Sequence, residues 1–302
     1  MATSRYLQLD VFCERPGGGN PLGVVVGADA WSGEEMQRFA HWTNLVETTF
    51  VLTPTDPRAS YRLRIFTPTK EIPFAGHPTI GSAHAVLETG FALPRDGALL
   101  QECGAGLLPV RVEGDGEDRR LFVQAPAARV VSEGMHVEPV LAYLLRGISP
   151  GALPPACVEG GRRWWVAEFA SEAALRGWRP DHASIATLAR ETDTLGLCAF
   201  ARRAGDQPDA GYDLVVRAFP AGVGIVEDPA SGAANGLIAA WIALREPEGP
   251  LACGYRVSQG REIDRDASIL VRIGEADAAG KAVVWVGGQT HIVVDGRTRW
   301  PY

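Results

Sequence analysis

The most constraining feature of the sequence is a segment that occurs twice: a glycine turn followed by a helix of small residues. The first copy covers residues 74–90, and the second covers 228–244, roughly 155 residues later. In the first copy Pro78 suits the first helical turn and Gly90 is a typical C-terminal stop. Small side chains leave little room between such a helix and the chain around it, so we expect each helix to be central in its half.

Strand-like segments surround both copies. Ser32 and Glu35 have the form of a capping box, which predicts a helix that ends near Thr43. Two further segments with helical periodicity are 137–145 and 181–190. Alternating or β-branched runs predict strands at 6–12, 22–26, 48–53, 61–67, 99–124 with a turn at Gly114–Gly116, 164–169, 195–201, 212–219, 254–259, 268–273, 282–287 and 290–295. Two halves that each place strands around one helix indicate an old duplication.

Composition narrows the class of protein. A chain of 302 residues is long for one compact core, and 46% hydrophobic with 22% charged residues is typical of a globular protein. The formal net charge of -7 provides no basic field for a polyphosphate, so we expect no nucleic-acid partner. The N-terminus lacks a signal-peptide pattern and no apolar run reaches the roughly 18 residues of a membrane span. We therefore expect a cytoplasmic protein without a membrane partner.

Neither cysteines nor histidines form a recognisable metal or disulfide pattern. The five cysteines are odd in number and widely spaced, which predicts buried, reduced thiols: Cys13, Cys103, Cys157, Cys198 and Cys253. The six histidines are dispersed, and Gly17–Gly19 lacks the strand-to-helix setting of a dinucleotide-binding turn. The sequence also contains no P-loop and no hydrolase elbow. We expect neither a metal nor a cofactor.

Glu47 is the first candidate for chemistry. It is bounded by apolar residues and comes immediately before a strand that looks buried. A partly buried carboxylate has a raised pKa, which suits it to take a proton from carbon and return it elsewhere. The alternative is an ordinary glutamate at a strand edge whose head reaches solvent.

The two helix starts are the second candidate. A helix that begins in a glycine turn presents unpaired N–H groups and the positive end of its dipole, so it can hold a carboxylate or an enolate. The alternative is a tight turn that only permits close packing. His77 lies at the first start, where the dipole favours a neutral imidazole, although it could simply cap the helix. We assign His84 to packing. Asp228 either orients His77 or, as capping preferences favour, caps the second helix.

The ordered motifs resemble one family, the PhzF-like phenazine-biosynthesis isomerases, which share the diaminopimelate-epimerase fold. The resemblance implies an α+β fold with two pseudo-symmetric domains, each a curved mixed sheet or barrel wrapped around a central helix, and usually a homodimer. The domains would be 1–125, completed by 288–302, and 126–287. The matching segments are Asp10–Phe12, Gly19–Pro21, Asn44–Phe50, Tyr61–Thr67, Phe74–Thr79, Phe219, Glu227–Gly232, Gln259–Gly260 and Gly287–Gly288.

The resemblance also implies a reaction and a site between the domains. The family's isomerase relocates a proton on dihydro-3-hydroxyanthranilate without a cofactor, and its acid/base glutamate corresponds to Glu47. His77 and Asp228 fall on the positions of helper residues. Groups that would bind a small carboxylate substrate are Asn20, Gly76, Pro78, Ser231, Gly232, Ala233 and Gln259. This sequence departs from the pattern at Val46 and Ala233, where serines are usual, and at 264–266, which puts the substrate in doubt.

Two other functions remain open. A two-base amino-acid epimerase or racemase of this fold has a cysteine at each helix start, whereas no cysteine lies at Gly76 or Gly232. A non-catalytic module that binds a small ligand or a protein would explain the two missing hydroxyls. Retention of Glu47, His77 and Asp228 together favours the enzyme.

Overall fold

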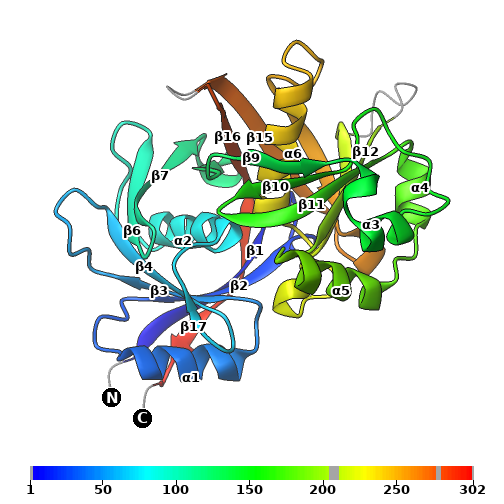
Figure 1. Cartoon of the computed structure of the whole chain (residues 1–302). Helices are drawn as coiled ribbons and strands as arrows, with labels where there is room; N and C mark the ends of the chain where they lie inside the picture. Colours follow the sequence, from blue (N-terminus) through cyan, green and yellow to red (C-terminus); the bar gives the residue numbers. More distant parts are fainter. Residues whose placement is uncertain (1–2, 204–210, 277–279, 301–302) are drawn as a thin grey trace. The chain divides into compact units, whose positions relative to one another are not determined.

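The computed structural model divides into two compact units, which we call unit 1 and unit 2 (Figure 1). Unit 1 consists of Met1–Gln124 with Gly287–Tyr302, and unit 2 consists of Ala125–Val286. The residues that the structure describes are 3–203, 211–276 and 280–300. The C-terminal strand therefore belongs to the same unit as the N-terminal strand.

Unit 1 contains a mixed sheet in the order β17-β1-β2-β3-β4-β6-β7-β8, with the short β5 paired to β4. Only β2–β3 and β4–β6 are parallel. The strand bounds are β1 Ser4–Val11, β2 Asn20–Val26, β3 Thr48–Leu52, β4 Tyr61–Phe66, β5 Glu71–Ile72, β6 Ala98–Cys103, β7 Gly106–Glu113, β8 Arg120–Gln124 and β17 Thr290–Thr298.

Helix α2 (Gly76–Glu88) is the centre of unit 1, and strands surround it in Figure 1. Every residue from His77 to Val86 is buried, and the helix lies against β1, β2, β3, β4, β7, β8 and β17. A Cβ added at Gly81 would meet Leu22 Cδ2 at 2.5 Å and Val11 Cγ2 at 2.8 Å. The small residues of this helix are therefore required by its packing, as the sequence predicts.

Helix α1 (Gly33–Thr43) forms as its capping box predicts. Ser32 accepts a hydrogen bond from the Glu35 backbone N–H, and the Glu35 side chain accepts one from the Ser32 backbone. The buried face of α1, which includes Met36 and Phe39, packs on a core cluster with Phe50.

Unit 2 repeats the pairing pattern of unit 1. Strands β10–β11, β12–β13 and β14–β15 pair antiparallel, whereas β11–β12 and β13–β14 pair parallel. The strands β1-β2-β3-β4-β6-β7 of unit 1 show the same alternation of antiparallel and parallel pairs. Helix α6 (Gly232–Arg245) occupies the place of α2 in chain order and lies against β10, β11 and β15. The strand bounds are β9 Arg129–Glu133, β10 Ala156–Gly160, β11 Arg162–Phe169, β12 Leu197–Arg202, β13 Leu214–Phe219, β14 Gly254–Gln259 and β15 Ala267–Ala276. The repeated topology supports the inferred duplication.

Of the remaining helices, α3 and α5 correspond to predicted segments, whereas α4 was not predicted. All three contribute to a core cluster of unit 2 together with β11, β12 and β13. The predicted helix at 137–145 starts only at Pro139, because Met135–Val137 forms a 3-10 turn. The predicted turn at Gly114–Gly116 runs into a second 3-10 turn, Gly116–Asp118. The bounds are α3 Pro139–Leu144, α4 Glu172–Gly177, α5 His182–Thr192 and β16 Ala282–Gly288; the elements missed were β5, β9, β10 and α4.

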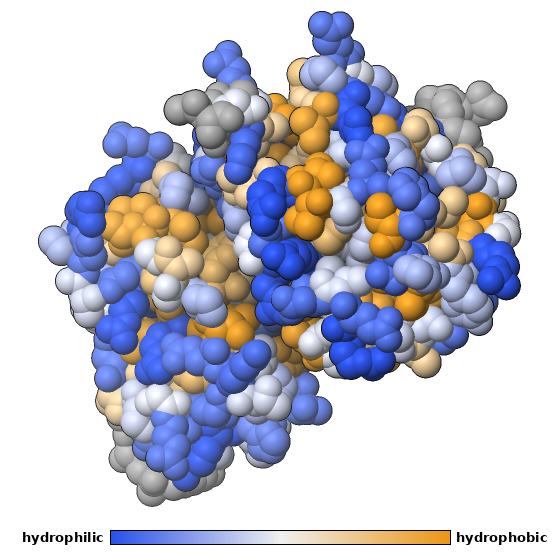
Figure 2. Space-filling model, in the orientation of Figure 1, coloured by the Kyte–Doolittle hydropathy of each residue, from blue (hydrophilic) through white to orange (hydrophobic). Residues whose placement is uncertain are grey.

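The face in Figure 2 shows separate hydrophobic areas among hydrophilic ones. Among the described residues, no helix has both the length and the hydropathy that a membrane span would need. The prediction of buried thiols is confirmed for Cys13, Cys157 and Cys198. It is wrong for Cys103, which is only half-buried, and for Cys253, which is exposed in the turn that follows α6.

Candidate active site

Glu47 lies in the short connection between α1 and β3. Helix α1 ends at Asn44 in a left-handed conformation (φ 53°), which redirects the chain toward β3. The Gly23 N–H donates to the Glu47 carbonyl at 3.5 Å, where β2 and β3 begin their parallel pairing. The Glu47 side chain is only 13% exposed. The alternative of a solvated head at a strand edge therefore does not describe this residue.

His77 is the second residue of α2, and its side chain is 8% exposed. Burial lowers the pKa of His77 to about 3, against a smaller opposing effect of a hydrogen bond with the Pro21 backbone. The prediction of a neutral imidazole is confirmed, with burial as the main cause. Nδ1 lies 3.6 Å from Glu47 Oε2, and Nε2 is buried without a hydrogen-bond partner in the described part of the chain. His77 thus places a neutral ring beside the glutamate, and the hydrogen-bonding capacity of its Nε2 is not used within the described residues.

The N-terminus of α2 is suited to a negative charge. Its N-cap residue, Ala75, is extended and makes no side-chain cap, and the first turn contains no acidic residue. Gly76 is partly exposed, whereas Pro78 is buried. Uncapped N–H groups and the helix dipole favour a carboxylate at this end.

A buried aspartate shapes the chain next to His77. Asp10 is 3% exposed, and its Oδ2 accepts hydrogen bonds from Gly17 N at 2.6 Å and Gly19 N at 3.1 Å. A Cβ at Gly19 would clash with the Val11 carbonyl oxygen. This loop leads directly into Asn20, a predicted substrate contact that is 1% exposed. We did not predict a role for Asp10, although an acid in an apolar strand before three glycines was a usable signal.

In unit 2, the turn before α6 is held by its own hydrogen bonds. The Asp228 N–H donates to Ala218 O at 2.8 Å, and Asp228 Oδ1 accepts from Ala230 N at 3.2 Å. The N-cap of α6 is Ser231, whose hydroxyl accepts from Ala234 N at 3.4 Å. The prediction that Asp228 caps the helix is therefore wrong: Asp228 lies four residues before Gly232, the first residue of α6, and bonds to Ala230, whereas Ser231 supplies the cap.

Gln259 connects this turn to α6. Its Nε2 donates to Asp228 O at 2.7 Å, and its Oε1 accepts from Ser231 N at 3.3 Å and from Asn235 Nδ2 at 3.0 Å. Both Gln259 and Asn235 are fully buried. Asn235 Oδ1 has no hydrogen-bond partner among the described residues, and we missed this residue because its context is an ordinary apolar helix. Gly232 and Ala233 are accessible, so the predicted anion-binding end of α6 is open to a ligand.

One described cavity is lined by other residues. It has a volume of about 460 Å³ in unit 1, and none of the predicted site residues lines it. Among its charged lining residues, Arg64 Nε and Nη2 bond to Glu71 at 2.8 and 2.7 Å, and Glu102 accepts from Thr55 N at 2.6 Å. The Glu47 and His77 region stays the candidate for the chemistry. No three His, Cys, Asp or Glu side chains are grouped for a metal ion within residues 3–203, 211–276 and 280–300.

Comparisons with known proteins show which family the sequence matches. A family model described as phenazine biosynthesis-like protein, PhzC-PhzF, matches residues 9–296. Antisense-enhancing sequence 1 of Schizosaccharomyces pombe is 33% identical over 99% of both chains. Trans-2,3-dihydro-3-hydroxyanthranilate isomerase of Pseudomonas aeruginosa is 34% identical over 97% of this chain and 98% of its own. A crystal structure of a PhzF-family protein from Bacillus anthracis covers 99% of both chains with a TM-score of 0.85 at 24% identity, which confirms the predicted α+β fold class.

Proposed function

Because the chain belongs to the PhzC-PhzF family of phenazine biosynthesis-like isomerases, we propose that it relocates a proton on a carbon of a small carboxylate without a cofactor, with Glu47 as general acid/base. The observation that carries the proposal is the neighbourhood of Glu47. A buried, neutral His77 lies with Nδ1 3.6 Å from the carboxylate oxygen of Glu47, at the uncapped start of a helix.

A neutral imidazole suits this task. A charged imidazolium beside Glu47 would stabilise the ionised glutamate and weaken it as a base. Neutral His77 instead supplies a hydrogen bond without a charge, while the N-terminus of α2 holds the substrate carboxylate. Glu47 then takes the proton from one carbon and returns it to another.

Thiol chemistry has less support. Burial raises the pKa of Cys157 to about 11, and it also raises the pKa values of Cys13 and Cys198. These three thiols stay protonated at neutral pH, whereas a two-base racemase of this fold needs a thiolate. A carboxylate base therefore explains the site better than a thiol pair.

The first substrate to test is trans-2,3-dihydro-3-hydroxyanthranilate, which the name of the Pseudomonas aeruginosa relative supplies. Val46 and Ala233 lack hydroxyl groups, so other cyclic and amino-acid carboxylates belong in the same panel. The proposed substrate contacts are Asn20, Gly76, Pro78, Ser231, Gly232, Ala233 and Gln259, with Asp228 as a helper. That Asp228 shares one site with Glu47 and His77, and that the protein is a cytoplasmic homodimer, stay predictions.

The test is Glu47→Gln against the panel. We expect kcat to fall by about 10²–10⁴, because that is the usual contribution of a positioned acid/base group. Substrate affinity by calorimetry should stay near the wild-type value, since the amide keeps the shape of the side chain. Glu34→Gln, at an exposed position of α1, is the matched control and should leave kcat unchanged. Wild-type turnover by Glu47→Gln would contradict the assigned role.

A further inference from the structure

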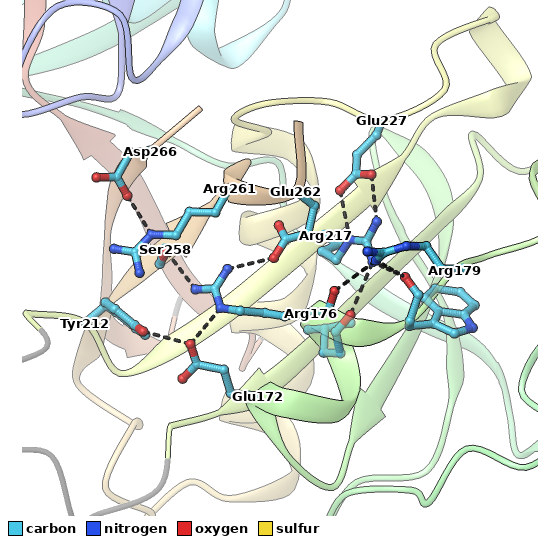
Figure 3. A network of polar contacts seen from close by, with 12 residues as sticks. Glu172, Arg176, Arg179, Tyr212, Arg217, Glu227, Ser258, Arg261, Glu262 and Asp266 are labelled. Atoms are coloured by element: carbon cyan, nitrogen blue, oxygen red, sulfur yellow. Dashed lines mark hydrogen bonds and ion pairs between the residues drawn. The ribbon is translucent and has the colours of Figure 1, made fainter. Parts of the chain in front are cut away.

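A buried arginine, Arg217, lies near the end of β13 (Figure 3). The loop that follows β13 leads to the Asp228–Ser231 turn, which precedes α6. Arg217, on β13, donates from Nε and Nη2 to the two carboxylate oxygens of Glu227, both at 2.9 Å. Its Nη1 donates to the carbonyl oxygens of Leu175 at 3.2 Å and Trp178 at 2.7 Å. The two side chains are 4% and 5% exposed. A bidentate pair of this kind fixes both the distance and the orientation of the carboxylate.

The ion pair closes a loop together with an adjacent backbone bond. After Phe219, where β13 ends, the chain passes through a 3-10 turn and Gly224 (φ 80°) and returns at Glu227. The next residue, Asp228, donates its N–H to Ala218 O. Two successive residues on β13 thus hold two successive residues at the loop exit. These bonds hold the loop exit where the Asp228–Ser231 turn begins.

Helix α4 contacts both Arg217 and the strand that carries Gln259. Arg217 binds carbonyl groups at the C-terminal end of α4, and Arg176 of α4 reaches the strand end that carries Gln259. Arg176 Nη2 donates to Ser258 Oγ at 3.1 Å, and Nη1 donates to Glu262 at 2.8 Å. Figure 3 shows these contacts as one connected region around α4. Helix α4 therefore contacts both Arg217, which holds the turn through Glu227, and β14, the strand that carries Gln259.

We propose that Arg217 is a positioning residue of the active site: through Glu227 it fixes Asp228 and the start of α6. It acts through these residues and does not touch the substrate. Apolar residues of similar volume often stabilise a core as well as a buried ion pair does. A guanidinium that makes four directed bonds, two of them to Glu227, is therefore better explained by the orientation it imposes. The inference rests on the proposed function for the role of Asp228, but the order of the turn can be measured separately.

The experiment compares Arg217→Lys, which keeps the charge and loses the planar fork, with Glu227→Gln, which keeps the shape and loses the charge. We expect faster backbone hydrogen exchange at residues 228–235 in both variants. In Glu227→Gln the change should be confined to these residues, whereas Arg217→Lys should also affect the C-terminal end of α4, where the bonds to Leu175 and Trp178 are lost. We also expect kcat to fall on the order of 10²-fold with KM unchanged, because a small misplacement of a helper residue acts on the chemical step.

The matched control is Arg202→Lys. Arg202 makes comparable pairs with Glu168 at 2.8 Å and Glu246 at 2.8 Å, and Glu246 is the C-cap of α6 rather than its start. This variant should lower the melting temperature without changing exchange at 228–235 or kcat.

The outcomes are separable. Wild-type exchange at 228–235 in a folded Glu227→Gln protein overturns the proposal, even if Arg217→Lys fails to fold. Uniformly faster exchange along the whole of unit 2 also overturns it, because that result indicates a purely structural role. If wild-type protein turns over no carboxylate in the panel, the proposed function fails, and the exchange data alone decide whether Arg217 fixes the turn.

Discussion

At the scale of single residues, two buried histidines make unit 1 sensitive to acid. Burial is the main cause that lowers the pKa of His77 to about 3 and that of His84 to about 4. Both values lie below the pKa of about 6.5 of a histidine in an unfolded chain. Below pH ~6.5 the unfolded state therefore binds more protons than the folded state. The stability is complete above that pH and is lost as the pH falls toward 4 and then 3.

His84→Gln tests this directly, since His84 is not assigned to the chemistry. Between pH 7 and 4.5 the substitution should remove about 2–3 kcal/mol of the acid-induced loss in the free energy of unfolding. Urea titrations at the two pH values measure it. His182→Gln, at an exposed position in α5, is the control and should lose as much stability as wild type. Equal losses in His84→Gln and wild type would show that His84 protonates freely in the folded state.

At the scale of elements, the central helix depends on the absence of side chains. Gly81 in α2 has Leu22 and Val11 within 2.8 Å of the place where a Cβ would lie. Gly177 in α4 has nothing within 4 Å of that place. Helix propensity alone favours alanine at both positions. Of the two positions, only Gly81 is packed so closely that alanine should lower the free energy of unfolding.

Gly81→Ala should therefore destabilise the protein by about 1–3 kcal/mol, the usual cost of overpacking. Gly177→Ala should be neutral or stabilising by up to about 1 kcal/mol. Denaturant midpoints of the two variants measure the contrast. Two stabilised variants would mean that α2 has more room than its packing implies.

The elements that could be predicted were those with local signals. Ser32 and Glu35 determine the start of α1 by contacts three residues apart, and the strong apolar alternation of β1 is visible in a short window. Strand β10 follows a segment rich in glycine and proline and is held by pairing with β9 and β11. Helix α4 has only six residues, too few for a period, and is held by its Ser171 cap and by Arg217. Such long-range partners leave no local pattern.

At the scale of the whole molecule, each duplicated half holds the start of its central helix with a glutamine from a strand. Gln101 on β6 donates to Thr79, the fourth residue of α2, at 3.2 Å, and Gln259 on β14 accepts from Asn235, the fourth residue of α6, at 3.0 Å. The sequence predicted both helix starts and Glu47 because each belongs to a contiguous motif. It did not predict that Gln101 and Asn235 are buried partners of these helix starts, because a partner distant in sequence leaves no local pattern. Gln259 was predicted only as a substrate contact implied by the family resemblance.

The most direct test of the central claim is solvent exchange at carbon. Wild-type protein and Glu47→Gln are incubated in D₂O with the carboxylate that wild type turns over, and deuterium at each carbon is followed by NMR. We expect wild type to place deuterium on the carbon that receives the proton, and Glu47→Gln to place none above the uncatalysed background. Deuterium incorporation by Glu47→Gln at the wild-type rate would show that another group moves the proton.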